Sequence, residues 1–344
     1  MDLADRKLKI LQAIIRDFIT TAEPVGSRTI AKKYDLGISS ATIRNEMADL
    51  EELGYLQQPH TSAGRIPSDK AYRLYVDQMM IANKIAQIEK NIIQNSLLEK
   101  IGELEQIISH TAKILSQFTK LTAMVLSPQY RHSRLKHIQL IPMEGRRVLI
   151  VVVLESGVVK NAILRLNEVL SEENLEKVSK MMNHRLQGLT VADISAGVIH
   201  GMKNEMQMFN SIIETIMPMV MTTLEEIEEV HLYLDGLINI FNLPEYHDIN
   251  KARDFMSMLD QKELIKELLL NTKDGVNITI GKENKHENLQ ECSLITATYK
   301  LHGKTVGKIG VIGPTRMDYD NIISVVDFMT GNLTKLLKDY KEED

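Results

Sequence analysis

Residues 39–77 read SSATIRNEMADLEELGYLQQPHTSAGRIPSDKAYRLYVD, and this stretch decides how the rest of the chain is interpreted. Its first part predicts a helix, because four apolar side chains recur at helical spacing: Ile43, Met47, Leu50 and Leu53. Ser39 or Ser40 can cap this helix, since a short hydroxyl accepts hydrogen bonds from the unpartnered amides of a first turn. Gly54 follows, and glycine is the usual residue at which a helix ends.

Another face of this predicted helix has the surface that a helix needs to enter a DNA major groove. It carries Ala41, Arg44, Asn45 and Ala48. Small residues permit close approach, and the long side chains of Arg44 and Asn45 can form paired hydrogen bonds with guanine and adenine edges. We expect Ser40 and Thr42, at the helix start, to contact phosphate or bases.

A strand–loop–strand pattern follows the helix. Residues 55–58 favour a short strand, residues 59–65 form a turn-rich loop, and Ile66 begins a returning strand that Pro67 ends. A basic loop between two strands, placed after a recognition helix, is typical of the wing of a winged helix-turn-helix. Arg65 is the candidate in this loop for contact with phosphate or the minor groove.

The residues upstream complete a helix-turn-helix pattern. Residues 5–22 predict a first helix, Arg28 to Tyr34 a short second helix, and Gly37 lies in the turn before the third. The pattern by itself also permits an ordinary three-helix bundle.

Charge gives only weak support for DNA binding. The net charge is −5 overall; the first 76 residues hold 11 basic and 10 acidic residues, and the remainder holds 30 and 36. Non-specific affinity scales with the phosphates neutralised, so the basic residues must gather on one face of this module. Besides Arg44 and Arg65, the candidates for that face are Arg28, Lys32, Lys33, Lys70 and Arg73.

Two segments at opposite ends of the chain carry a family resemblance. SSATIRNEMADLEELGYLQQPHTSAGRIPSDKAYR, residues 39–73, and KIGVIGPTRMDYDN, residues 308–321, resemble the heat-inducible transcription repressors of bacteria, the HrcA family. The resemblance implies an α+β multidomain fold with an N-terminal winged helix-turn-helix. A GAF-like α+β domain carrying an inserted, mostly helical dimerisation domain then follows. We accordingly expect boundaries at residues 1–77, 78–169, 170–245 and 246–344.

The resemblance also implies a function. It implies a homodimer that binds an inverted-repeat DNA operator, represses heat-shock (chaperone) operons and loses activity on heat stress, with the chaperonin restoring that activity. One winged helix-turn-helix module per half-site is consistent with this function, because the symmetry of a dimer mirrors the symmetry of its operator.

The remaining pattern is mixed. We expect strands over 121–126, 135–142, 147–154, 158–166, 276–280, 292–300 and 305–312. We expect helical structure over 68–82, 85–118, 172–186, 191–208, 211–229, 250–270 and 319–337. From about residue 170 to residue 240 the pattern is interpreted as turning helical again.

Two features leave alternatives open. Methionine is dense in one region: Met202, Met206, Met208, Met217, Met219 and Met221. Flexible core filling is the favoured interpretation, and an adaptable dimer or chaperone-binding surface is the alternative. Residues 313–316 favour a strand-to-helix turn on the sheet; exposed amides there can also hold an anion, and Arg316 can instead bridge this domain to the DNA-binding module.

Chemistry of other classes finds little support. The single cysteine, Cys292, permits no intrachain disulfide, suggests a reducing, cytoplasmic compartment, and is interpreted as a buried structural thiol. No signal peptide is seen, and the longest apolar run, residues 148–154, is too short to cross a membrane. No metal, cofactor or catalytic set is evident. The competing hypotheses are a metabolite-responsive regulator and an enzyme fused to a winged helix.

Overall fold

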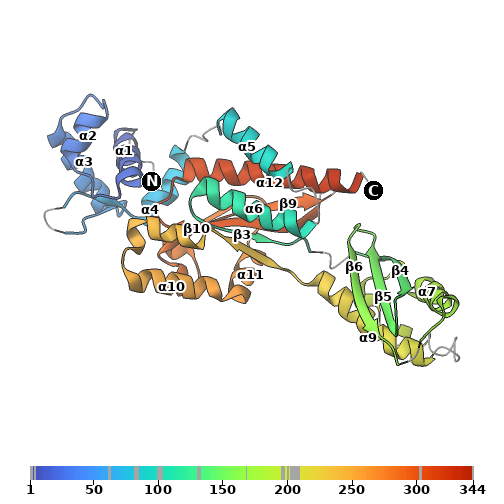
Figure 1. Ribbon diagram of the computed structural model, residues 1–344. Coiled ribbons are helices and arrows are strands. Elements are labelled where there is room, and N and C mark those ends of the chain that lie inside the picture. Colours follow the sequence, from blue (N-terminus) through green and yellow to red (C-terminus); the bar gives the residue numbers. More distant parts are fainter. Residues whose placement is uncertain are drawn as a thin grey trace. The chain divides into compact units, whose positions relative to one another are not determined.

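The chain divides into two compact units in this computed structural model. The structure describes residues 3, 5–60, 63–80, 85–98, 104–129, 133–167, 169–194, 198–199, 201, 210–301 and 304–342. Unit 1 combines Met1–Ser127 with Leu232–Glu342, and unit 2 comprises Pro128–His231 and the last two residues. In unit 1 we call the part up to Met80 the head, and the remainder the core. Figure 1 labels the elements of both units.

The head consists of three helices followed by a two-stranded hairpin. Their bounds are α1 Asp5–Thr21, α2 Ser27–Lys33, α3 Ser40–Glu52, β1 Leu56–Gln57 and β2 Ile66–Pro67. These elements agree with those that the sequence predicts. Ser39 is the cap of α3, because its Oγ accepts a hydrogen bond from the Thr42 amide at 3.1 Å. Gly54 follows α3 with a φ of 77°, a conformation that glycine adopts without strain.

A short helical segment leads out of the head. It comprises α4 Asp69–Leu74 and a π-helix, η1, Tyr75–Met79. The sequence predicts one regular helix over residues 68–82, and the pattern does not reveal the change to π-helical hydrogen bonding at Tyr75. Such single-turn π segments occur often at functional sites.

The core is built on a five-stranded antiparallel sheet with the order β7-β3-β10-β9-β8. The strands are β3 Thr122–Leu126, β7 Leu232–Asp235, β8 Asn277–Ile280, β9 Cys292–Leu301 and β10 Lys304–Pro314. The helices are α5 Gln87–Leu98, α6 Leu104–Thr119, α10 Ile249–Asp260, α11 Lys262–Leu270 and α12 Tyr319–Glu342. Figure 1 shows α6 and α12 along one face of the sheet, with α10 and α11 on the other. Short 3-10 turns, η4 Leu237–Asn242, η5 Pro244–Tyr246, η6 Gly281–Glu283 and η7 Glu287–Leu289, connect these elements.

Two expectations for this part of the chain are wrong. Residues 232–235, expected to be helical, form the edge strand β7, where Met124 of β3 is the partner of Leu234. The expected helix over 250–270 is two helices, because Gln261 leaves helical geometry with a ψ of 71°. Residues 232–235 follow a long helical segment closely, and they are extended because they pair with the distant strand β3. Such pairing leaves no signal in the local sequence.

Unit 2 is a three-stranded antiparallel sheet with helices packed on it. The strands are β4 Leu135–Pro142, β5 Arg147–Leu154 and β6 Val159–Arg165. Helices α7 Glu172–Leu186 and α9 Asn210–Glu228 fill one face, and η2 Val191–Asp193 is a short 3-10 turn. Of the helix expected over residues 191–208, Val191–Asp193 form this 3-10 turn, and residues 195–197, 200 and 202–208 lie outside the described part.

The division of the chain therefore differs from the expected one. From the sequence, residues 78–169 are expected in the core domain and residues 170–245 in a mostly helical insertion. In the structure, Pro128–His231 form unit 2 together with the strands β4, β5 and β6, and β7 belongs to the core sheet. The physical reason is that β4, β5 and β6 pair with one another and bury their apolar face against α7 and α9.

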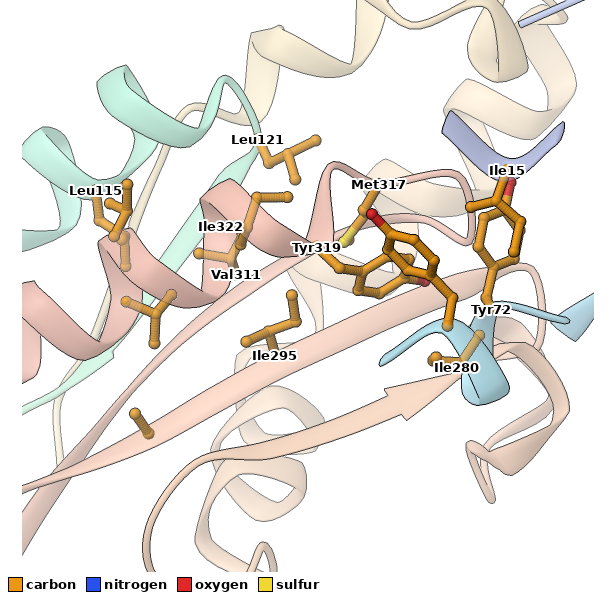
Figure 2. Close-up of a cluster of buried hydrophobic side chains, with 14 of the residues drawn as sticks. Ile15, Tyr72, Leu115, Leu121, Ile280, Ile295, Val311, Met317, Tyr319 and Ile322 are labelled. Atoms are coloured by element: carbon orange, nitrogen blue, oxygen red, sulfur yellow. The ribbon is translucent and has the colours of Figure 1, made fainter. Parts of the chain in front are cut away.

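One hydrophobic cluster runs from the head into the core. Ile15 of α1 and Tyr72 of α4 lie beside Met317 and Tyr319 at the start of the α12 region (Figure 2). The rings of Tyr72 and Tyr319 are 5.8 Å apart between centroids, tilted by 47°. Both tyrosines are almost fully buried, so head and core share a packed interior.

Cys292 is expected to behave as an unreactive thiol in the folded protein. It is buried at 3% exposure, 3.6 Å from the Tyr246 hydroxyl, and burial raises its pKa to about 11. Only the thiolate is nucleophilic, so at pH 8 an alkylating reagent should modify Cys292 at least about 100-fold more slowly in the native chain than in urea. Mass spectrometry of timed samples measures both rates. Equal rates would contradict the burial of this thiol.

Candidate nucleic-acid interface

Helix α3 separates an apolar face from a small polar one. Ile43, Met47 and Leu50 are buried against the other head helices. Ala41, Arg44, Asn45 and Ala48 are exposed. Among the described residues, neither Arg44 nor Asn45 has a hydrogen-bond partner, so both side chains are available to a ligand. This is the face that the sequence predicts for contact with base edges.

Three of the four acidic residues of α3 pair with cations from other elements. Lys7 of α1 lies 2.8 Å from Glu46 and 2.9 Å from Asp49, and its hydrogen bond to Glu46 is the main cause of a raised pKa. Glu51 pairs with Arg65 at 2.7 Å. A polyanion approaching α3 therefore meets paired carboxylates, and repulsion at this face is reduced.

The hairpin β1–β2 is fixed to the rest of the head at Arg65. Both Nε and Nη2 of Arg65 donate to Oε2 of Glu51, at 2.8 and 2.7 Å. Its backbone forms a two-way bridge with Val25 at 2.9 Å in each direction. Arg65 is expected from the sequence to be a free contact, but the structure places it in an ion pair that joins the hairpin to α3. Thr61 and Ser62, at the loop tip, lie outside the described residues.

Gly64→Ala is expected to displace the hairpin. An added Cβ would lie 2.5 Å from the carbonyl carbon and oxygen of Val25 and 2.7 Å from the Pro24 carbonyl oxygen. All three atoms belong to the backbone and cannot rotate away, so the free energy of unfolding should fall by about 1–3 kcal/mol. Urea denaturation measures this change.

Gly331→Ala is the matched control, because a Cβ at this helical position meets nothing within 4 Å. It should be neutral or stabilising by about 0.5–1 kcal/mol, as alanine favours the helix. Equal effects of the two substitutions would show that the Val25 contact does not restrict Gly64.

The remaining basic candidates are either exposed without a partner among the described residues or held by one, and Lys70 belongs to the second group because its Nζ donates to the Leu53 carbonyl at 2.9 Å. Arg28 and Lys32 of α2 are exposed. Lys33 pairs with buried Asp17 at 2.5 Å, and this hydrogen bond raises the pKa of Lys33. Arg73 pairs with Glu283 of the core at 2.5 Å. Ser40 and Thr42 are half-buried at the start of α3, and the Thr42 hydroxyl lies 3.0 Å from Ser39 Oγ.

Known proteins resemble the whole of this chain. The family model described as "HrcA protein C terminal domain" matches residues 105–323. The heat-inducible transcription repressor HrcA of Alkaliphilus metalliredigens is 48% identical over 339 residues, covering 98% of this chain and 99% of the relative. The chain belongs to the HrcA family. It is a heat-inducible transcription repressor and not an enzyme.

Further comparisons agree with this assignment. The repressor HrcA of Pelotomaculum thermopropionicum is 44% identical over 340 residues, covering 98% of each chain. A solved structure titled "Crystal structure of a hypothetical protein at 2.2 A resolution" has a TM-score of 0.68 and 22% identity, and covers 98% of this chain and 100% of its own. That similarity shows a shared fold.

In this repressor, several residues around α3 were not predicted from sequence. Lys7, Glu51 and Asp17 each pair with a side chain at least 14 positions away. The sequence carries no periodic signal for such pairs. The charge balance indicated only that the basic residues had to gather on one face of the module.

Arg316 connects the core of this repressor to its head. Its guanidinium donates to both carboxylate oxygens of Glu245, at 2.5 and 3.0 Å, and through Nη1 to the Ile19 carbonyl of α1 at 2.5 Å. This confirms the bridging role that the sequence analysis left open beside the turn interpretation. The anion site at residues 313–316 stays a prediction.

Two features are absent from the described residues. No group of three or more His, Cys, Asp or Glu side chains in that part of the chain is placed to hold a metal ion. Within the same residues, no helix combines the length and the apolar character needed to span a membrane.

Proposed function

We propose that this repressor binds an inverted-repeat operator of heat-shock (chaperone) operons as a homodimer. In this proposal the head is a winged helix-turn-helix, with α3 as recognition helix and β1–β2 as wing, and the core is GAF-like. The observation that carries the proposal is the exposed face of α3, where Arg44 and Asn45 are unpartnered among the described residues while Glu46, Asp49 and Glu51 are paired with cations.

The proposed contacts divide by availability. Arg44 and Asn45 read base edges, and Ser40 and Thr42 contact phosphate or bases at the helix start. Arg28 and Lys32 are exposed and contact phosphates. Lys33 can contact phosphate only if it leaves Asp17, and Arg65 only if it leaves Glu51, so these two residues contribute less to DNA affinity. Arg73 is held by Glu283, and we assign it to the junction of head and core instead of to DNA.

Arg44→Ala tests the reading of base edges. Footprinting of the purified protein on the DNA upstream of its own operon first defines the operator. The variant should then lose about 1–3 kcal/mol of operator binding, because a paired guanine contact is removed, and retain binding to random DNA. Titration of both duplexes by fluorescence anisotropy measures this. Equal losses on both would contradict the role in specificity.

Lys32→Ala serves as the companion variant. A lost phosphate contact should weaken binding to operator and random DNA alike and lower the slope of log affinity against log salt by about one. A slope equal to that of the unmodified protein would show that Lys32 does not contact a phosphate.

The open face of unit 2 supports the proposed homodimer. Alternate residues of its three strands point away from α7 and α9: Ile141, Leu149, Val151, Val153, Val159 and Ile163. Ile141, Val159 and Ile163 are 41%, 57% and 54% exposed. Exposed apolar side chains gathered on one face are typical of an interaction site, and a two-fold axis lets the same face pair with itself.

The free edge of β4 is already occupied, which favours face-to-face association. Asn183 of α7 both donates to and accepts from the Ile138 backbone at 2.7 Å, and Ser179 accepts the Leu140 amide at 3.0 Å. These side chains satisfy backbone groups that a partner strand would need. The second copy is therefore proposed to cover the apolar face.

Heat response is proposed to arise from marginal stability of the DNA-binding state. Met217 is buried in unit 2, and Met219 and Met221 are half-buried against its apolar cluster; Met202, Met206 and Met208 lie outside the described residues. Flexible thioether side chains fill a core without fixing it tightly. Active and inactive states that differ by a few kcal/mol would exchange on heating, with the chaperonin restoring the active one.

This part of the proposal has its own test. Operator affinity of the purified dimer, measured across the heat-shock range with and without chaperonin, should fall on heating and recover only with chaperonin. Full affinity throughout, without chaperonin, would contradict it.

A further inference from the structure

We propose that Arg73 and Arg316 act as positioning residues that hold the head on the core in one orientation, and so select the spacing between operator half-sites. This inference rests on the proposed binding of a two-fold operator by a dimer. We call the two arginines, with Glu283 and Glu245, the clasp.

Arg73 forms the first half of the clasp. From α4 its Nε and Nη2 donate to the two carboxylate oxygens of Glu283, at 2.8 and 2.5 Å, and Nη2 also donates to the Ile278 carbonyl of β8 at 2.7 Å. Glu283 in turn accepts the Ile280 amide at 2.9 Å, which fixes the carboxylate. A two-pronged arginine–carboxylate pair restricts direction as well as distance.

Arg316 forms the second half from the opposite side of the junction. It belongs to the core, between β10 and α12, and its Nε and Nη2 donate to the two carboxylate oxygens of Glu245. Its third donor reaches the Ile19 carbonyl, two residues before α1 ends at Thr21. Arg316 is 12% exposed, so water competes little for this contact.

Other residues of the head and the core also form specific contacts with one another. Tyr75 of the π-helix donates to Asp320 at 2.9 Å, and the Lys282 amide donates to Asp69 of α4 at 3.2 Å. The buried rings of Tyr72 and Tyr319 pack between head and core (Figure 2). Because α1 and α4 are held separately, the head cannot rotate on the core without breaking one half of the clasp.

The clasp is therefore expected to govern orientation more than stability. Arg73 and Glu283 are 30% and 37% exposed, and ion pairs at such positions contribute little to folding. Orientation matters because the two heads of a dimer must meet half-sites separated by a fixed number of base pairs. A head freed to rotate would accept several separations.

The test compares operator duplexes whose half-sites are moved closer or further apart. The unmodified protein should bind best at one separation and at least about 10-fold more weakly when the separation changes by half a helical turn. The double variant Arg73→Ala/Arg316→Ala should show differences below about threefold across the series, with unchanged affinity for a single half-site. The single variant Arg73→Glu should lose part of the selectivity, and adding Glu283→Arg, which re-forms the pair with its charges exchanged, should restore part of it.

Lys251→Ala is the matched control. Its partner Glu291 lies 2.7 Å away in the core, both side chains are at least half exposed, and the pair does not join head to core. Its separation profile should equal that of the unmodified protein. The same sharp profile in the double variant would overturn the inference, as would an equal loss on the single half-site, which would mean damage within the head. Failure of the unmodified protein to bind any operator would instead refute the proposed function.

A distance measurement tests the same inference without DNA. Spin labels at Glu52→Cys of the head and Asp254→Cys of the core occupy exposed positions; Cys292→Ser removes the native thiol. Excess unlabelled chain suppresses distances between subunits. The distribution should be narrow with the clasp intact and broad in the double variant. A narrow distribution in both would overturn the inference.

Discussion

Val151→Lys is expected to convert the proposed homodimer into a monomer and to weaken operator binding by about 10²–10⁴-fold. Val151 lies on the central strand β5, and its strand partners Gln139 and Asn161 flank it on the open face. A lysine there would carry its charge into the middle of a face that a second copy covers, where desolvation of an unpaired ammonium is costly. Loss of the second head removes the effective concentration that links two half-sites.

Two measurements test the Val151→Lys variant. Analytical ultracentrifugation gives the mass in solution, and anisotropy titration gives affinity for the full operator and for one half-site. Affinity for the single half-site should be unchanged, since the substitution lies in unit 2 and the head in unit 1.

Val169→Lys provides the same chemical change outside the open face. Val169 is 71% exposed after β6 and belongs to none of the three strands. This variant should remain dimeric and bind the operator normally. A dimeric Val151→Lys protein would refute the proposed use of this face, even if operator binding were impaired.

Tyr319→Ala is expected to lower the free energy of unfolding of unit 1 by about 3–5 kcal/mol, the usual cost of deleting a buried aromatic ring. The Tyr319 side chain is fully buried, and its ring packs on Tyr72. Its hydroxyl donates to the Thr315 carbonyl at 2.6 Å and lies 2.7 Å from Ser293 Oγ. Urea denaturation followed by circular dichroism measures the change.

Tyr319→Phe separates the ring from the hydroxyl. It keeps the packing but leaves the Thr315 carbonyl and Ser293 without this partner, which should cost about 1–3 kcal/mol. If Tyr319→Phe were as destabilising as Tyr319→Ala, the ring packing in Figure 2 would contribute nothing measurable.

The sequence was sufficient to predict elements and their buried faces wherever local signals and burial agreed. The apolar spacing of Ile43, Met47 and Leu50 fixed which side of α3 is buried, and therefore that Arg44 and Asn45 are exposed. Leu53, the fourth residue of the predicted stripe, is instead the C-cap and is 37% exposed. Strands β4 and β5 have the bounds that their sequence predicts, because alternating apolar residues and short turns specify a hairpin meander locally.

Prediction from sequence was less successful where a residue's role depends on a distant partner. Arg65 and Arg73 are both predicted from the sequence to contact DNA, and that pattern does not reveal that Glu51 and Glu283 hold them in ion pairs. Residues 135–165 were assigned to the core sheet, and they instead form a sheet of their own in unit 2. Strand pattern reveals that a strand exists and does not reveal which strand it joins.

The sequence by itself determined the helices of the head, the exposed polar face of α3 and membership in the repressor family. The tertiary structure alone decided where the chain divides, which cations neutralise α3, and how Arg73 and Arg316 connect head to core. The reason is physical: helix periodicity and capping act over a few residues, whereas ion pairs and strand partners join positions such as Arg73 and Glu283, 210 residues apart.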